Sequence, residues 1–258
     1  MQEVDINTDI GEGFGNYAMP NDEAIMPLVT SANIACGFHA GDPLVMNKTV
    51  ALAKQHGVAV GAHPGLPDLM GFGRRVMELA PEEIKNYLIY QVGALKAFAE
   101  VQGLKLHHVK PHGAFFRSTK ANEAQARAMV EAFLEIDPKL MLYCPGPPEL
   151  YHPPLAKVVA EMGMRLIPEF YADLNYKPDG TMVSPGKGKR VELAPSEAAQ
   201  RVLGFFKEGK VTTIDGTELS FEALSICVHS DSPQAVEYLK AMRDAFSEAG
   251  ITIKTVEG

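Results

Sequence analysis

The 258-residue sequence has few cysteines, no long apolar run and no excess of positive charge. Its three cysteines, Cys36, Cys144 and Cys227, lie far apart and form no CxxC pair. This argues against a disulfide framework and a structural zinc site, so we expect buried, reduced thiols. No segment approaches the roughly 18 to 20 apolar residues of a membrane span, and the N-terminus lacks the pattern of a secretory signal. We expect a cytoplasmic protein without membrane attachment.

Basic residues are outnumbered by acidic ones, 24 to 32, which gives a formal net charge of -8. Such a chain has no general attraction for nucleic acid phosphates or anionic lipid, so we expect no nucleic-acid partner. Hydrophobic residues make up 46% of the chain, enough for a substantial core. Since α/β barrels of this length do not divide, a single domain over residues 1–258 is expected.

The sequence also lacks a nucleotide-binding motif. The glycines of GEGFG, residues 11–15, do not follow the GxGxxG spacing and predict a tight turn instead. The basic stretch GKGKR, residues 186–190, lacks the Ser or Thr of a Walker A loop. It is interpreted as a solvated loop, with a lid that contacts phosphate as the alternative.

Short β-prone segments alternate with amphipathic helical segments along the whole chain. The β-prone segments cover residues 4–7, 31–36, 58–63, 107–110, 139–144, 165–169 and 225–229. This alternation indicates βα units and a parallel sheet. Asp5 and Asn7 lie opposite Val4 and Ile6 in the first segment, whereas a sheet covered on both faces would be almost entirely apolar. The pattern therefore predicts a closed barrel wrapped in helices.

Three helices and one hairpin have recognisable signals. Asp42-Pro43 predicts a helix start with an end near Gly57, and Ser232-Pro233 predicts another start. Apolar residues at three- and four-residue steps predict a helix over residues 81–102. Asp215-Gly216 between β-prone arms predicts a hairpin insertion near residues 210–220.

Polar residues gather directly after the β-prone segments, at the strand-to-helix turns. In chain order they are Asn7, Asp9 and Glu12; His39 and Asp42; His63, Asp68, Arg74 and Arg75; Lys110 and His112; Glu169 and Asp173; His229 and Asp231. In a parallel barrel all these turns lie at one end, where active sites of that fold are built. We therefore predict one shared pocket, although Asp42 and Asp231 could instead cap helices.

Six blocks of the sequence resemble the LamB/YcsF family. They are DINTDIGEGFG, SANIACGFHAGDP, GAHPGLPDLMGFGRR, VKPHGAFF, EFYAD and ICVHSDSPQAV, between residues 5 and 236. The resemblance implies a distorted, TIM-like α/β barrel of about seven parallel strands, related to deacetylase and glycoside hydrolase barrels. It also implies ATP-dependent opening of the lactam ring of 5-oxoproline to L-glutamate, with ADP and phosphate released. The partners implied are two further 5-oxoprolinase subunits.

Residue roles follow from this chemistry, since phosphorylation of the lactam carbonyl oxygen by ATP, expected with Mg²⁺, would create a better leaving group. Lys110 and the two arginines could stabilise phosphate or oxyanion charge, carboxylates could bind Mg²⁺ or orient water, and histidines could transfer protons. Candidate catalytic residues are Asp9, His39, His63, Lys110, His112, Asp173 and His229. Candidate substrate or phosphate ligands are Asn7, Glu12, Asn33, Asp42, Arg74, Arg75 and Glu169.

Two alternatives remain open. Asp9, His108 and His112 could hold a transition metal for hydrolysis of a small or carbohydrate amide, as in deacetylation. The second alternative is that the chain is a non-catalytic subunit that binds 5-oxoproline. The chain also departs from the family pattern at three places. Leu174 stands where the family commonly has an arginine, and the stretch SPGKGKR, residues 184–190, stands where a glycine-rich connection commonly carries another. Ser230 stands where the family usually has a glycine. Missing arginines would weaken recognition of a carboxylate or phosphate, unless Lys187, Lys189 or Arg190 compensates.

Overall fold

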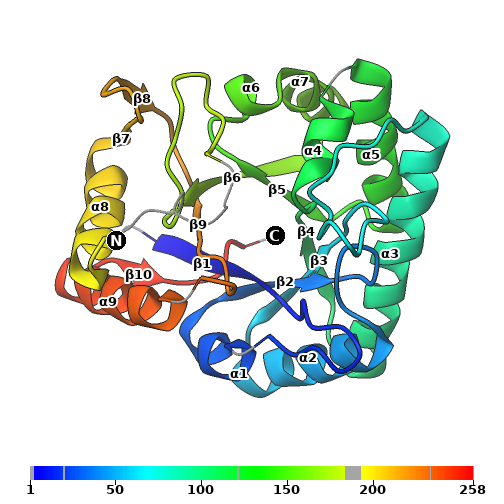
Figure 1. Cartoon of the computed structure of the whole chain (residues 1–258), viewed down its shortest axis with the longest axis horizontal. Coiled ribbons are helices and arrows are strands. Elements are labelled where there is room, and N and C mark those ends of the chain that lie inside the picture. Colours follow the sequence, from blue (N-terminus) through cyan, green and yellow to red (C-terminus); the bar gives the residue numbers. More distant parts are fainter. Residues whose placement is uncertain (1–2, 20, 121, 184–192, 233, 258) are drawn as a thin grey trace.

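Seven parallel strands close into a barrel in the computed structural model, which describes residues 3–19, 21–120, 122–183, 193–232 and 234–257 (Figure 1). The barrel strands are β1 (Glu3–Ile10), β2 (Ser31–Ala35), β3 (Ala59–His63), β4 (Leu106–Val109), β5 (Met141–Pro145), β6 (Arg165–Tyr171) and β9 (Ser225–Cys227). Each pairs with the next, and β9 pairs with both β6 and β1, which closes the ring. The predicted closed, TIM-like barrel is confirmed.

Helices surround the barrel on the outside (Figure 1). They are α1 (Asp22–Ile25), the 3₁₀ helix η1 (Met26–Leu28), α2 (Pro43–His56), α3 (Pro81–Val101), α4 (Ala114–Thr119), α5 (Glu123–Ile136), α6 (Pro148–Tyr151), α7 (Pro153–Met162), α8 (Pro195–Glu208) and α9 (Ala235–Glu248). Within the described residues, none of these helices has the length and apolar character needed to cross a bilayer.

The ends of α2 agree with its sequence signals. The Asp42 carboxylate accepts hydrogen bonds from the backbone amides of Leu44 and Val45, and Gly57 ends the helix in the left-handed conformation. The last helix does not start at Ser232 as predicted, and Pro233 lies outside the described residues. Ser232 lies in a turn, and α9 begins at Ala235.

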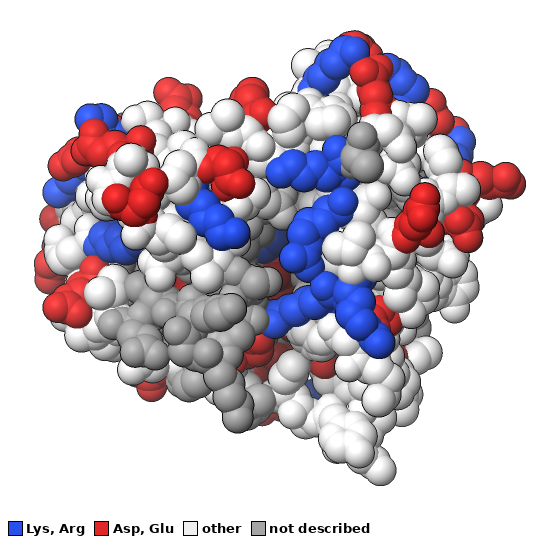
Figure 2. All heavy atoms as spheres, turned by 45° about the horizontal axis from the view of Figure 1, so that its top comes forward, with Lys and Arg blue, Asp and Glu red and all other residues white. Residues whose placement is uncertain are grey.

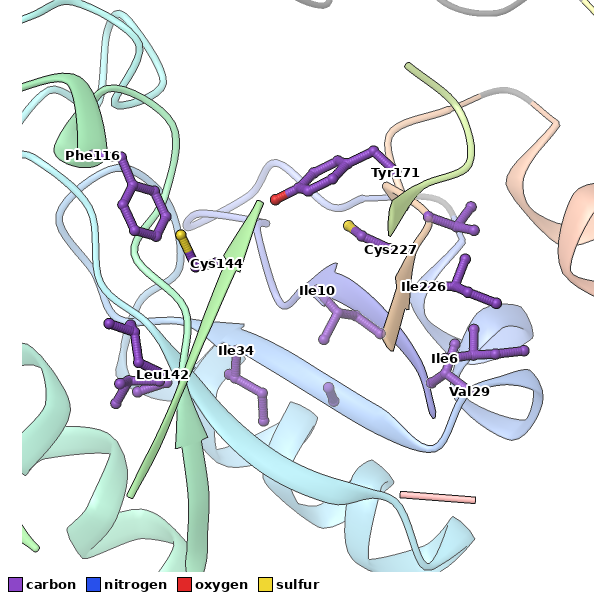
Figure 3. Packing of buried hydrophobic residues seen from close by; sticks show 14 of the residues in the cluster. Ile6, Ile10, Val29, Ile34, Phe116, Leu142, Cys144, Tyr171, Ile226 and Cys227 are labelled. Atoms are coloured by element: carbon purple, nitrogen blue, oxygen red, sulfur yellow. The ribbon is translucent and has the colours of Figure 1, made fainter. Parts of the chain in front are cut away.

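Alternation along the strands separates a polar interior from an apolar exterior. Asp5 points inward, where its carboxylate accepts hydrogen bonds from the hydroxyls of Ser31, Tyr143 and Ser225 on three other strands. Ile6, Ile10 and Ile34 belong instead to the large apolar cluster of the molecule (Figure 3). Neutral donors surround the buried Asp5 carboxyl, and burial raises its pKa.

A small apolar cluster lies near the end of the barrel opposite the strand C-termini. Met141, Tyr143 and Ile167 form this cluster, and Val256 of the C-terminal segment packs against it. That segment is held by β10 (Thr252–Ile253), a short strand paired with β1 that the sequence analysis does not anticipate.

Two further features agree with the sequence. β7 (Lys210–Thr212) and β8 (Glu218–Ser220) form an antiparallel hairpin where Asp215-Gly216 predicts one. The three cysteines are buried and unpaired, as expected for reduced thiols.

Candidate active site

A cavity of about 390 Å³ opens at the C-terminal end of the strands. Its walls include Asp9, His63 and Tyr171, from β1, β3 and β6. Lys110, His112 and His229, from the segments that follow β4 and β9, line it as well. Three cationic side chains, Arg74, Arg117 and Lys120, also line it. Figure 2 shows Lys and Arg side chains gathered along a hollow in this face. Residues more than 200 positions apart therefore meet around one cavity.

Lys110 is the central cation of the cavity floor. Its ammonium group lies 2.9 Å from Asp9 Oδ1, 3.3 Å from Glu169 Oε1 and 3.0 Å from Cys227 Sγ. Burial opposes the charge, but Asp9, Cys227 and Glu169 together outweigh it and hold the pKa of Lys110 well above its ordinary value. The protons of this ammonium are directed at protein acceptors, so Lys110 balances buried negative charge.

An amide layer lies beneath this ion pair. Asn7 donates to Glu169 Oε1 at 2.7 Å, and Asn33 donates to Asn7 Oδ1 at 2.7 Å and to Asp9 Oδ1 at 2.9 Å. Burial raises the pKa of Glu169. Because each amide donates to a neighbour, the layer fixes the orientation of the Asp9 carboxylate above it.

His108 belongs to the same layer, so the predicted metal triad of Asp9, His108 and His112 is not assembled. The His108 Nε2 atom lies 2.7 Å from Asn33 Oδ1, in a space that exists because residue 61 is glycine. A Cβ at Gly61 would stand 2.0 Å from that nitrogen. On a helix, His108 and His112 would lie on one face because they are four residues apart. Here β4 ends at Val109, so the chain between them is not helical and the two side chains do not share a face. His108 stays within the barrel, whereas His112 lies on the connection above it.

Asp9 also contacts two histidines. Its Oδ2 atom lies 3.3 Å from His63 Nε2 and 3.8 Å from His229 Nε2. Burial would raise the pKa of Asp9, but the charges of His63 and Lys110 outweigh it and hold this pKa well below the ordinary value. Asp9 is therefore a carboxylate at neutral pH.

His229 is held on its other side by Asp173. The His229 Nδ1 atom lies 2.9 Å from Asp173 Oδ1, and the Asp173 side chain is fully buried. Burial disfavours the imidazolium, yet the carboxylates of Asp173 and Asp9 outweigh it and raise the pKa of His229. These two carboxylates thus favour the protonated form of a histidine that lines the cavity.

Glu12, His39, His63 and His112 form a compact buried group beside Asp9. His39 Nε2 lies 3.1 Å from Glu12 Oε1, and the His39 ring stacks on the His112 ring with centroids 3.8 Å apart. Burial raises the pKa of Glu12 and lowers the pKa of His39 and His112 well below the ordinary value. Within the described residues, this is one of two groups whose donor atoms are close enough to share a metal ion.

Two predicted ligands are engaged outside the cavity. Asp42 caps α2 and accepts from the backbone amide of Gly15, so its capping interpretation is the one that the structure favours. Arg75 pairs with Asp68 and points outward, with 65% of its side chain exposed. Arg74 does line the cavity, 3.6 Å from Asp231 Oδ2. Leu174 is a buried cavity residue, and the basic stretch with Lys187, Lys189 and Arg190 lies outside the described residues.

Several residues in or next to the cavity are not predicted from the sequence. Tyr171 lies two residues after Glu169 on the same face of β6, so strand alternation could have identified it. Cys227 is interpreted as an inert apolar residue, yet its sulfur accepts from Lys110. Arg117 and Lys120 lie in and after the short helix α4, where no strand-end pattern marks them.

Comparisons with known proteins agree with this architecture. The model of the LamB/YcsF family matches residues 4–258. Similar curated proteins include the 5-oxoprolinase A-subunit of Pyrococcus horikoshii, 48% identical with 97% of this chain and 96% of the relative covered. A 5-oxoprolinase A-subunit of Pseudomonas aeruginosa is 46% identical, with 98% and 99% covered.

A solved structure shares both sequence and fold. The lactam utilization protein from Thermus thermophilus superimposes with a TM-score of 0.88 at 42% identity, and 99% of this chain and 100% of that chain are covered. With a family model that extends over almost the whole sequence and relatives of nearly the same length, the chain belongs to the LamB/YcsF family.

Proposed function

We propose that this chain is the A-subunit of a 5-oxoprolinase, which opens the lactam ring of 5-oxoproline to L-glutamate. The observation that carries this proposal is the convergence of Asp9, Lys110, His63 and His229 on one cavity of about 390 Å³. This volume lies in the range of small-molecule sites, and 5-oxoproline fits easily within it. The names of the similar curated proteins give the substrate class.

The proposed reaction consumes ATP, bound with Mg²⁺, and releases ADP and phosphate. An amide carbonyl is a weak electrophile, and transfer of the terminal phosphoryl group of ATP to the lactam oxygen activates the lactam carbon. Attack of one water molecule and departure of the ring nitrogen leave an acyl phosphate, which a second water molecule hydrolyses to L-glutamate and phosphate. The cavity supports an anionic reactant, because Arg74, Arg117 and Lys120 line it. Lys110 is less suited to this task, since Asp9 and Glu169 already neutralise it.

Asp9 and His229 are the proposed proton-transfer residues, because the site favours the ionised form of Asp9 and the protonated form of His229. Asp9 is ionised and lies against His63 and His229, so it can orient a water molecule for attack on the lactam carbon. His229, whose protonated form is favoured by Asp173, can deliver a proton to the departing ring nitrogen. Two groups with displaced pKa values at one cavity are the usual arrangement of an acid and base pair.

The proposal includes two further 5-oxoprolinase subunits as partners and is tested by reconstitution. Phosphate release from ATP is measured with 5-oxoproline for this chain alone and for the mixture with its partner subunits. Glutamate formation coupled to phosphate release in the mixture is the expected result. Amide hydrolysis that does not depend on ATP and is abolished by a chelator would favour the metal-dependent amidase instead. Turnover that persists in the Asp9→Asn variant would favour a binding subunit.

A further inference from the structure

Two histidine nitrogens face each other in this site with no proton between them in their neutral forms. His63 Nε2 and His112 Nδ1 are 2.9 Å apart. The other nitrogen of each ring lies against a backbone carbonyl oxygen, His63 Nδ1 at 2.6 Å from Lys110 O and His112 Nε2 at 2.8 Å from Phe72 O. A carbonyl oxygen only accepts, so each of those nitrogens carries the ring proton. When both rings are neutral, the facing nitrogens present lone pairs, so either a proton or a metal ion must lie between them, next to the Asp9 carboxylate 3.3 Å from His63 Nε2.

Glu12 supplies a third donor at a suitable distance. Its Oε1 atom lies 3.6 Å from His112 Nδ1 and 4.0 Å from His63 Nε2. Three atoms with these separations lie on one circle, so a single position is about 2.1 Å from all of them. Zinc bonds to imidazole nitrogen and carboxylate oxygen are about 2.0 to 2.2 Å long. We propose that His63, His112 and Glu12 form a binding site for a divalent transition metal ion.

The surroundings of these three residues match a metal site. Histidine ligands normally donate their second N–H to a carbonyl or carboxylate, as both do here. His39 lies 3.1 Å from the Glu12 oxygen, and its Nδ1 atom is buried without a hydrogen-bond partner among the described residues. Its proton therefore belongs on Nε2, where Glu12 accepts it. His39 is a positioning residue for the Glu12 carboxylate.

Glycines at two positions allow this packing. A Cβ at Gly65 would lie 2.3 Å from His39 Nδ1, and a Cβ at Gly73 would lie 2.8 Å from His112 Cδ2. Gly73 also has a positive φ of 62°, a conformation that favours glycine. Both glycines stand in the block GAHPGLPDLMGFGRR, and they let the imidazole rings approach the backbone closely.

The second group of potential metal ligands, Asp9, Cys227 and His229, is already occupied by a cation. The Lys110 ammonium lies 2.9 Å from Asp9 Oδ1 and 3.0 Å from Cys227 Sγ, so a metal ion there would meet a fixed positive charge. In the histidine group the donor atoms of His63 and His112 face each other and the Glu12 carboxylate instead. This difference selects the first group over the second.

The donor set points to a class of metal. Two imidazoles with one carboxylate suit zinc, manganese, iron or cobalt, whereas magnesium and calcium prefer oxygen donors. His63 and His112 line the cavity, so an ion bound between them would have a side open to it. Such an ion polarises a carbonyl oxygen or activates a water molecule. The assignment rests on side-chain positions alone and holds whatever substrate the cavity takes.

The test is metal binding by the untagged full chain after chelator treatment. Calorimetric titration with Zn²⁺, and visible absorption with Co²⁺, are expected to show one ion per chain. His63→Gln and His112→Gln are each expected to weaken binding at least about 10-fold, as is Glu12→Gln. His56→Gln is the matched control, because His56 is exposed near the end of α2 and should leave binding unchanged. The proposal is overturned if the unmodified chain binds no metal ion, or if all four variants bind it as tightly as the unmodified chain. The short distance between the two rings would then be explained by a shared proton.

An independent measurement covers the case in which a variant fails to fold. Anomalous scattering from a crystal of the unmodified chain with Co²⁺ is expected to place the ion within bonding distance of His63 Nε2, His112 Nδ1 and Glu12. An ion at Asp9, Cys227 and His229, or only on the surface, refutes the assignment.

Discussion

Replacement of Lys110 by methionine tests whether the buried ion pair with Asp9 is essential to the barrel. The Nζ to Oδ1 distance is 2.9 Å, and the two side chains are only 2% and 6% exposed. At an effective dielectric constant of about 20, the attraction across that distance is about 6 kcal/mol. Removal of the ammonium leaves Asp9 buried with one of its counter-charges gone. Loss of one partner of a buried pair costs about 3–5 kcal/mol, and we expect a loss of that size.

The assay is urea unfolding followed by far-UV circular dichroism, because the chain has no tryptophan. Lys157→Met is the matched control: Lys157 contacts Glu123 Oε2 at 2.6 Å, but these side chains are 58% and 42% exposed. Water screens an exposed pair and little stability depends on it, so this variant should be almost as stable as the parent. The double variant Lys110→Met with Asp9→Asn should recover about 1.5 kcal/mol or more relative to the sum of the single variants. Additive losses, or equal losses for Lys110 and Lys157, would refute the reasoning.

Three other predictions concern burial, space and charge. Burial raises the pKa of Asp22 to about 6, so the unfolded chain, with a pKa near 3.8, binds fewer protons between these values and stability falls as pH rises. Asp22→Asn should therefore stabilise the protein by about 1–3 kcal/mol at pH 7 in thermal unfolding, with the gain lost below about pH 4. Gly61→Ala should cost about 1–3 kcal/mol of unfolding free energy, because its Cβ meets His108. Gly93→Ala in α3, where a Cβ meets nothing within 4 Å, should be neutral or stabilising, and similar costs for both would contradict this explanation. Asp173→Asn removes the charge that raises the pKa of His229, so the alkaline limb of the rate profile should move to lower pH; an unmoved limb would exclude His229 as the acid.

The barrel is predictable from the sequence because alternation on a strand carries direct information on which face is buried. Asp5, Asn7 and Asp9 alternate with apolar residues in β1, and no open α/β sheet would tolerate that pattern at full burial. The short strand β10 is not predictable in the same way. Its two residues, Thr252 and Ile253, carry too little pattern, and their position depends on pairing with β1.

The sequence predicts which residues lie at the strand ends, but it does not predict which side chains contact one another there. Strand-end position brings Lys110 and His229 to the cavity as expected. It does not reveal that His108 lies in a lower layer, or that Asp42 is used by the first turn of α2. These outcomes depend on side-chain space and local hydrogen bonds, such as the room left by Gly61, which a single sequence does not display.

The most direct test of the central claim is glutamate formation from 5-oxoproline and ATP by the reconstituted complex with Asp9→Asn in this chain. Asparagine keeps an oxygen for the hydrogen bond from Asn33 and removes the charge that faces His63 and His229. Loss of a group that takes part in proton transfer typically costs about 10²- to 10⁴-fold, so kcat should fall by at least about 100-fold while the far-UV spectrum stays the same. A folded variant that forms glutamate at the unmodified rate would contradict the claim that the chemistry takes place in this cavity.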